Sequence, residues 1–280
     1  MKFKFFFLAS LFIYSCNNSN NESISLYNFL PNESSVIINI NDLKNTKEIL
    51  NKNKLLPNLL SSTKEISTLL NLLSSKNSRR EGILSLSDYG KDEVAFTYIR
   101  KSNSFDSIQA SDKLKNTYQK NSIFLEESNG NEIYKVIIGE YIVSSNKDII
   151  LENIIRDFYL KQSKIDSELN KILKTTDFDE PFNIFTKSDN LDTFKNDLSE
   201  ISFFPKSNTS WVGYDFNYSF ENVYLTGITK ISDSINGKIS ILKNISASKT
   251  KTDKIIPNSF LTFLTFSTSD SERFIFNLKD

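Results

Sequence analysis

The sequence predicts an α+β fold, with mainly antiparallel sheet and helices packed on one face of it. Residues 210–218 and 221–230 alternate apolar and polar side chains, which is typical of antiparallel strands with one covered face. Asn129-Gly130 separates two expected strands and is a strong hairpin signal. Strands occur in clusters with helices between them, and this order favours α+β over a regular strand-helix-strand repeat.

The first half of the chain begins with a turn. Leu30-Pro31-Asn32-Glu33-Ser34 leads into a β-branched strand, and Asn41 or Asp42 can cap the helix that follows. The helix expected at 63–74 places its apolar residues on one face. Asp88-Tyr89-Gly90 joins two expected antiparallel strands. In order, we expect a strand at residues 35–40, a helix from 43 to about 50, a helix at 63–74, and strands at 83–86 and 93–99.

The second half continues with hairpins and amphipathic helices. The Asn-Gly turn joins two expected strands, and Gly139 turns the chain into a third strand at 141–144. The helix expected at 147–160 carries an apolar stripe. In order, we expect a helix near 106–118, strands at 123–125, 133–137 and 141–144, helices at 147–160 and 164–174, a strand at 182–185, a helix at 189–198, and the two alternating strands.

The N-terminus has the features of a lipoprotein export signal. Lys2 and Lys4 supply positive charge, and residues 5–13 form an apolar run. That run is too short to span a bilayer as a helix, which needs about 20 residues. Ile13-Tyr14-Ser15-Cys16 resembles the lipobox of bacterial lipoproteins, although Tyr14 stands where the motif usually has a small residue. The resemblance implies that residues 1–15 are removed and that Cys16 carries the lipid.

Two other interpretations of the N-terminus are an ordinary signal peptide with a chance cysteine and a buried N-terminal strand. Cys16 is the only cysteine of the chain, and it lies where charge and hydrophobicity both change, which favours lipidation. Residues 16–25 are expected to form a polar tether. Asn17 is not the Asp that, by family analogy, retains lipoproteins in the inner membrane, and the acidic surface-export run is missing. We therefore expect an outer-membrane lipoprotein that faces the periplasm.

Composition argues against several functions. The chain has no His, which is the commonest general base and metal ligand, and its 7 glycines are few for a phosphate-binding loop. Basic and acidic residues are both 34, and loss of Lys2 and Lys4 leaves an acidic excess of two. Nucleic-acid binding is therefore disfavoured, because it needs basic residues to neutralise phosphates. No cofactor and no metal are expected.

Several short segments resemble a family of uncharacterised bacterial envelope proteins, often lipoproteins, that are built from repeated α+β units. They are the opening Leu30-Pro31-Asn32-Glu33-Ser34, the segment Gly130-Asn-Glu-Ile-Tyr-Lys135 with Tyr141-Ile-Val-Ser-Ser-Asn-Lys147 downstream, and the strand pair from Trp211 to Gly227. The likeness spans roughly residues 26–275. Because the family has no assigned activity, the resemblance implies a fold and a location in the cell envelope but no biochemical activity.

Residues 26–250 are expected to form the α+β domain. Pro257-Asn258 repeats the opening of that domain, with a strand expected at 260–266 and a helix from Glu272. Residues 251–280 are then either the start of a second, truncated repeat or a terminal strand and helix of the same domain. The apolar residues of the final segment would lack a covering partner, so a gene fragment is a third interpretation.

Two polar clusters suggest chemistry. Asp177-Phe178-Asp179-Glu180 could bind Ca²⁺ or supply the carboxylate pair of a glycoside hydrolase. It lacks the Asp-x-Asp-x-Asp-Gly frame and precedes Pro181, so a solvated turn is favoured. Ser61 and Lys64 have the Ser-x-x-Lys spacing of some hydrolases, but the companion motifs are absent and a helix cap is favoured.

Two further sets of residues suggest binding or modification. Trp211, Tyr214, Tyr218 and Tyr224 could form a stacking platform for a glycan, although alternation separates Trp211 from Tyr214 and Tyr218 and favours sheet packing. Ser107 and Ser234 lie in Asp-Ser-Ile tripeptides that resemble O-glycosylation sites of some Gram-negative lineages.

The sequence thus predicts a non-enzymatic cell-envelope lipoprotein with an interaction or structural role. Its expected partners are the membrane, through the lipid, and an unknown envelope protein or glycan. The alternative is a glycan- or peptidoglycan-binding lipoprotein that uses the Tyr-rich sheet face. An enzyme of unrecognised type is the third hypothesis.

Overall fold

The computed structural model describes the chain from Ser25, the last residue of the predicted tether, onward. The described residues are 25–53, 81–90, 93–102, 113–128, 131–162, 165–187, 211–218, 222–229, 242–246, 248–249 and 268–279. The predicted signal, Cys16 and the helices expected at 63–74 and 189–198 lie outside these ranges, as does the strand expected at 260–266.

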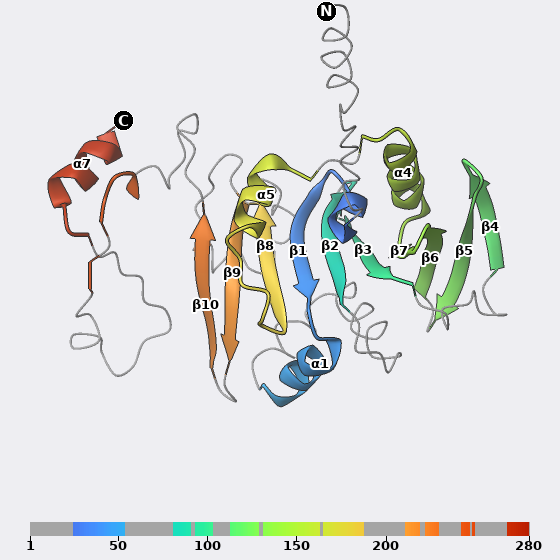
Figure 1. Cartoon of the computed structure of the whole chain (residues 1–280), viewed down its shortest axis with the longest axis horizontal. Coiled ribbons are helices and arrows are strands. Elements are labelled where there is room, and N and C mark those ends of the chain that lie inside the picture. Colours follow the sequence, from blue (N-terminus) through green and yellow to red (C-terminus); the bar gives the residue numbers. More distant parts are fainter. Residues whose placement is uncertain are drawn as a thin grey trace, which may run out of the picture.

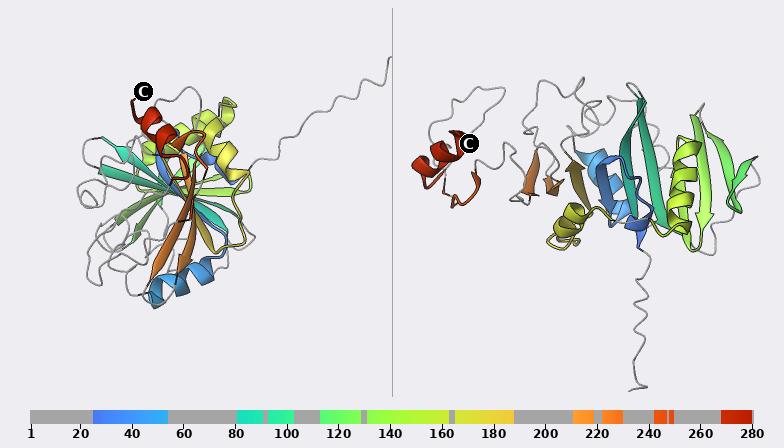
Figure 2. Two further views of the ribbon diagram at one scale, coloured as in Figure 1. Left: turned by 90° about the vertical axis from the view of Figure 1, so that its left-hand side faces the viewer. Right: turned by 90° about the horizontal axis from the view of Figure 1, so that it is seen from above.

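Ten strands form one antiparallel sheet, in the order β10-β9-β8-β1-β2-β3-β7-β6-β5-β4 (Figure 1). Seen from its β10 end, the sheet has fanned strands, as expected from the normal strand twist (Figure 2, left). The strands are β1 (Ser34–Ile40), β2 (Gly82–Tyr89), β3 (Glu93–Lys101), β4 (Lys113–Tyr118), β5 (Asn121–Ser128), β6 (Asn131–Ile138), β7 (Tyr141–Ser145), β8 (Phe182–Lys187), β9 (Trp211–Tyr218) and β10 (Val223–Thr229).

The central strand β1 shows how the sequence gives two buried faces. Ile37 and Ile38 are adjacent, so their side chains point to opposite faces of the sheet. Ile37 joins the larger core with α4 and α5, and Ile38 packs with the smaller clusters on the other side. We name these the α4 face and the α1 face. A sheet covered on both sides explains the β-branched run of β1, which does not alternate with polar residues.

The helices divide between these two faces. The 3₁₀ turn η2 (Leu26–Phe29), α4 (Asp148–Tyr159) and α5 (Ser167–Leu173) lie on the α4 face, where Phe29 stacks against Phe158 with ring centroids 5.2 Å apart. Helix α1 (Leu43–Lys52) places Leu43 and Ile49 in the clusters of the α1 face. The α+β antiparallel fold is therefore confirmed, and the helices cover both faces where one face was expected.

Helix α7 (Ser271–Lys279) follows the sheet in the chain, and it agrees with the helix expected from Glu272. Its apolar side chains are largely exposed, at 53% for Ile275, 56% for Phe276 and 59% for Leu278. The ring of Phe276 lies 5.3 Å from the Arg273 guanidinium carbon.

One element prediction is wrong. Residues 113–118, expected at the end of a helix, form strand β4, and residues 106–112 lie outside the described ranges. Gln119 and Lys120 have φ of 44° and 67° and make a two-residue turn from β4 into β5. Hairpin turns of this kind favour Asn and Gly, so Gln-Lys gives no sequence signal for the turn. The other expected elements within the described residues are confirmed.

Candidate functional site

The segment between η2 and β1 lines two of the cavities described below. The Ser25 N–H donates to Asn28 Oδ1 at 2.8 Å and fixes the start of η2. Ser34 Oγ donates to the Pro31 carbonyl at 2.6 Å and closes the turn. Ser85 Oγ of β2 donates to Ser34 Oγ at 2.7 Å, in a buried contact that ties the turn to the sheet. We call residues 30–34 the Leu-Pro turn.

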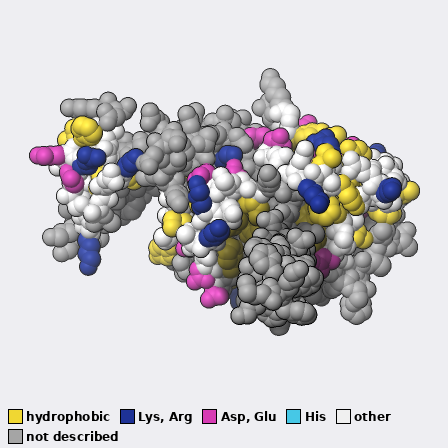
Figure 3. Space-filling view, turned by 45° about the horizontal axis from the view of Figure 1, so that its top comes forward, with side chains coloured by type: hydrophobic (Ala, Val, Ile, Leu, Met, Phe, Trp, Pro, Cys, Tyr) yellow, Lys and Arg dark blue, Asp and Glu magenta, His cyan; other side chains and the backbone are white. Residues whose placement is uncertain are grey.

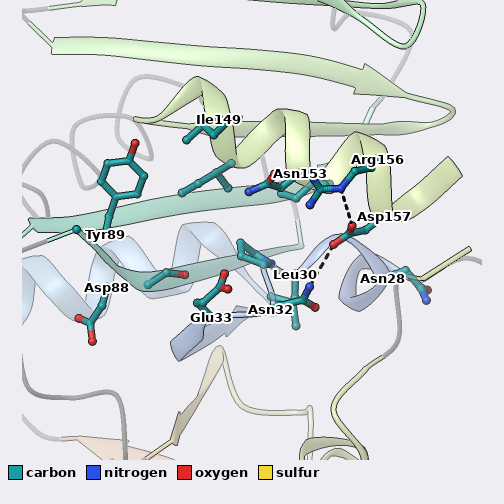
Figure 4. A pocket seen from close by; sticks show the side chains of 15 residues that line it. Asn28, Leu30, Asn32, Glu33, Asp88, Tyr89, Ile149, Asn153, Arg156 and Asp157 are labelled. Atoms are coloured by element: carbon teal, nitrogen blue, oxygen red, sulfur yellow. Dashed lines mark hydrogen bonds and ion pairs between the residues drawn. The ribbon is translucent and has the colours of Figure 1, made fainter. Parts of the chain in front are cut away.

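The first cavity, which we name the Arg156 cavity, lies between the Leu-Pro turn, the end of β2 and α4 (Figure 4). Its volume is about 340 Å³. Asp157 bridges the turn and the helix, because its carboxylate accepts from Asn32 Nδ2 at 3.1 Å and lies 3.4 Å from Arg156 Nε. The polar side chains in its wall are those of Asn28, Asn32, Glu33, Ser87, Asp88, Tyr89, Asn153, Arg156 and Asp157.

The second cavity lies on the other side of the Leu-Pro turn, and we name it the Trp211 cavity. Its volume is about 200 Å³. Leu30, Pro31 and Asn32 line both cavities, so the turn separates them. The other residues in the wall of the Trp211 cavity come from η2, β1, α5 and β9 and the residues next to them, and are Tyr27, Ser34, Ile37, Ile165, Asp166, Leu169 and Trp211.

Asp166 is the charged group of the Trp211 cavity. Its Oδ1 accepts from the backbone N–H groups of Glu168 at 2.9 Å and Leu169 at 3.3 Å, which caps α5, and its Oδ2 lies 3.3 Å from Lys187 Nζ. Burial would raise the pKa of Asp166 and is the largest single influence. The backbone hydrogen bonds from Leu169 and Glu168, the nearby Trp211 indole N–H and the Lys187 charge together outweigh it and lower that pKa. The carboxylate is therefore ionised and neutralised by Lys187.

Two polar groups in the same wall are buried without a hydrogen bond of normal geometry to any described residue. They are the hydroxyl of Tyr27 and the indole Nε1 of Trp211, whose side chain is 3% exposed. The indole N–H lies close enough to Asp166 to help lower its pKa, but it does not complete a well-formed bond. Burial raises the pKa of Tyr27 well above its usual range, so its hydroxyl stays protonated at neutral pH.

A third, shallow cavity contains part of the predicted acidic cluster. Phe178, Asp179 and Glu180 lie in its wall, and its volume is about 610 Å³. Asp177 and Asp179 are both exposed, and Asp177 Oδ1 accepts from the Asp179 N–H at 3.0 Å, as in a turn. Among the residues that the structure describes, no cluster of three or more Asp, Glu, Cys or His side chains could hold a metal ion. The geometry agrees with the solvated turn favoured by the sequence.

The four aromatic residues proposed as a stacking platform do not share one face. The register pairs Tyr214 with Gly227 and Asn217 with Tyr224, so alternation places Trp211 and Tyr224 on the α4 face and Tyr214 on the α1 face. Trp211 is buried, Tyr214 is half-buried and Tyr224 is 60% exposed, while the side chain of Tyr218 is not described. Of the four, Trp211 alone lines one of the three cavities above.

Two residues of the segments quoted for the family resemblance, Asn146 and Tyr134, make defined side-chain hydrogen bonds. Asn146 Oδ1 accepts from the Phe96 N–H at 2.9 Å, and Asn146 Nδ2 donates to the Val94 carbonyl at 3.2 Å, so this side chain continues the β3–β7 pairing beyond Ser145. Tyr134 donates to Glu132 at 2.6 Å. This hydrogen bond, followed by burial, raises the pKa of Tyr134 to about 12.

The remaining predicted site residues, Cys16, Ser61, Lys64, Ser107 and Ser234, lie outside the described ranges. Sequence reasoning missed Tyr27 and Asp166 as cavity residues. An N-cap signal was present at Asp166, directly before the first apolar positions of α5, but no local pattern links it to Trp211.

Comparisons of the whole chain with protein-family models, with curated proteins and with solved structures found no match. In the described part of the chain, no helix has the length and hydrophobicity needed to cross a membrane. On the face shown in Figure 3, the basic and acidic side chains of the described residues are interspersed.

Proposed function

We propose that this protein is a lipid-anchored lipoprotein of the bacterial cell envelope that works by binding a partner and not by catalysis. The observation that carries the proposal is the Ile13-Tyr14-Ser15-Cys16 segment, with the only cysteine of the chain at the end of an apolar run. Buried acyl chains stabilise membrane attachment by about 0.8 kcal/mol per CH₂, so two or three chains anchor a protein without a transmembrane helix. The proposed address is the periplasmic face of the outer membrane.

The position of the cavities supports a binding role close to the membrane. Cys16 precedes Ser25, the first described residue, by nine residues. A fully extended tether of that length spans at most roughly 30 Å. Residues of the segment 27–34, which follows the tether in the chain, form part of the wall of both the Arg156 cavity and the Trp211 cavity. A lipid on Cys16 would therefore hold both cavities near the membrane surface, where an envelope protein or a glycan could reach them.

Glycan binding is the second candidate function, and one observation favours it. Trp211 lies in the wall of a cavity, next to the Arg156 cavity with its amide and carboxylate side chains. Aromatic rings with convergent polar groups suit sugars, which present apolar faces and hydroxyl groups. We therefore propose the cavities beside the Leu-Pro turn as the glycan site, in preference to the Tyr-rich strand pair.

The anchor is tested by the substitution Cys16→Ala. We expect the wild-type chain to remain with membranes after carbonate washing and the variant to be released, because the thiol is the only acceptor for the lipid. Ser19→Ala, three residues along the proposed tether, is the matched control and should stay with the membrane. Retention of Cys16→Ala by washed membranes would show that the anchor assignment is wrong.

A further inference from the structure

We propose that the Trp211 cavity binds one neutral N-acetylated sugar ring, held by the Tyr27 hydroxyl and the Trp211 indole N–H as donors and by the Asp166 carboxylate as acceptor. This inference rests on the second candidate function and gives it a ligand class and a site. It is independent of the lipid anchor, so the two can fail separately.

The unpaired donors are the first reason to expect a ligand. A buried polar group without a partner destabilises a fold by roughly 1–3 kcal/mol, so such groups are rare unless they serve a function. The Tyr27 hydroxyl and Trp211 Nε1 lie in the wall of one cavity and both lack a well-formed bond to a described residue. A carbonyl oxygen, such as that of an acetamido group, would accept from donors of this kind.

The charged groups at the Trp211 cavity make binding of an ionic ligand unfavourable. Asp166 is the only residue of the described lining that is charged at neutral pH, and Lys187 lies 3.3 Å from its Oδ2. Asp166 Oδ1 already accepts two backbone hydrogen bonds, whereas Oδ2 faces the Lys187 ammonium group. A paired carboxylate can still accept from a ligand hydroxyl. A cationic or anionic ligand would upset the existing neutral pair.

The volume and the apolar lining of the Trp211 cavity further restrict the class of ligand. The cavity volume of about 200 Å³ is below the range of drug-sized sites, roughly 300–1,000 Å³, and suits a single ring. The aliphatic side chains of Leu30, Ile37 and Leu169 lie in the same wall as the polar groups. An apolar surface beside two donors and one acceptor matches the C–H face, the acetyl group and the hydroxyls of an N-acetylhexosamine.

Water is the alternative occupant. Polar cavities of this size commonly hold ordered water that satisfies otherwise unpaired groups. Water alone would satisfy both donors but would give no saturable response to a sugar, so a titration distinguishes the two occupants.

The test uses the fluorescence of Trp211, which is the only tryptophan of the chain. The full chain is purified in a detergent without a sugar head group and titrated with N-acetylglucosamine, with glucose as the comparison that lacks the acetamide. We expect a saturable shift of the emission maximum with N-acetylglucosamine and a weaker or absent response to glucose. N,N′-diacetylchitobiose distinguishes two possible sources of the sugar. If it binds at least as tightly as N-acetylglucosamine, the cavity accepts the end of a glycan strand. If it does not bind, the cavity accepts only a free sugar.

Two variants locate the binding. Tyr27→Phe removes one donor and should weaken binding roughly five- to tenfold, the effect of one lost hydrogen bond. Its melting temperature without sugar should not fall, because the deleted hydroxyl is unpaired, and a purely structural role of Tyr27 would predict a fall. Trp211→Phe keeps an aromatic ring but removes the N–H, and calorimetry should show a similar loss of affinity.

Tyr224→Phe is the matched control, because it removes an exposed tyrosine hydroxyl outside the cavity wall and should bind like the wild type. The proposal is overturned if neither N-acetylated sugar gives a saturable response. It is also overturned if Tyr27→Phe and Trp211→Phe both bind as tightly as the wild-type chain.

Discussion

At the scale of single residues, Asp166 connects structure with the candidate site. Its carboxylate caps α5, contacts Lys187 and lies in the Trp211 cavity. The pKa of Asp166 is lowered in the folded protein, so its charged form contributes stability at neutral pH. That contribution is complete above the unfolded-state pKa of about 3.9 and is lost as the pH falls through the folded-state value.

Asp166→Ala should therefore destabilise the protein at pH 7 and do so less in acid. The loss of an N-cap costs about 1 kcal/mol, and this figure excludes the partly solvent-screened ion pair. Urea unfolding at pH 7 and near pH 3 measures the difference. Asp166→Asn, which can still cap a helix, should lose less stability than Asp166→Ala. An equal loss at both pH values would contradict the role given to the charge, and exposed Asp179→Ala is the control.

The sequence pointed to some of these residues but not to their proximity. The sequence singles out Trp211 as an aromatic residue, separates it by alternation from Tyr214 and Tyr218 and favours sheet packing, but it does not indicate a cavity wall. Tyr27, Asp166 and Trp211 are brought together by the position of η2 and α5 on the α4 face. Long-range packing of this kind leaves no trace in local periodicity.

At the scale of elements, helix α5 packs closely on β9 at a glycine. A Cβ atom added at Gly213 would lie 2.7 Å from Ile172 Cγ2 and 3.3 Å from the Phe185 ring. Phe185 is the cross-strand neighbour of Gly213 in β8, so the glycine makes room for both a helix and a ring. Close contact between α5 and β9 in turn fixes the wall that Leu169 and Trp211 share.

Gly213→Ala should destabilise the fold by roughly 1–3 kcal/mol, because overpacking a close contact forces the helix or the ring to move. Chemical unfolding measures this loss in the wild-type background and in Ile172→Ala, which removes the clashing methyl group. The cost of Gly213→Ala should be smaller in the Ile172→Ala background, since residues in contact are not additive. An equal cost in both backgrounds would show that the contact with Ile172 does not limit the packing.

Sequence patterns predicted elements better where the turn chemistry was recognisable. The antiparallel pairing of β5 with β6, which the Asn-Gly signal predicts, and the two alternating strands β9 and β10 are confirmed. Strand β4 was missed because Gln119 and Lys120 make its turn with positive φ, which neither residue type favours. For residues 113–118, the helix expected from the sequence is replaced by strand pairing with β5.

At the scale of the whole molecule, the sheet order depends on pairings between distant segments. Strand β1 lies between β2 and β8, and β8 follows it by more than a hundred residues. The antiparallel class could be inferred from hairpins, but the β1–β8 pairing and the covering of both faces could not. These features place the Leu-Pro turn at the start of β1, an interior strand of the sheet, with a cavity on each side of the turn.

The proposed lipid anchor relates the position of the two cavities to function. A tether of nine residues would hold the Leu-Pro turn and both cavities close to the membrane in which the lipid is embedded. The protein would then act as a fixed binding domain of the envelope, and its partner would have to approach within the length of that tether.

Mass spectrometry of the N-terminal peptide, from protein purified out of membranes, tests the central claim most directly. The account predicts that the chain begins at Cys16 and that this peptide carries the added mass of a diacylglycerol group, with or without a third acyl chain. The Cys16→Ala variant should yield no acylated N-terminal peptide. An unmodified Cys16, or a mature chain that still begins at Met1, would contradict the account.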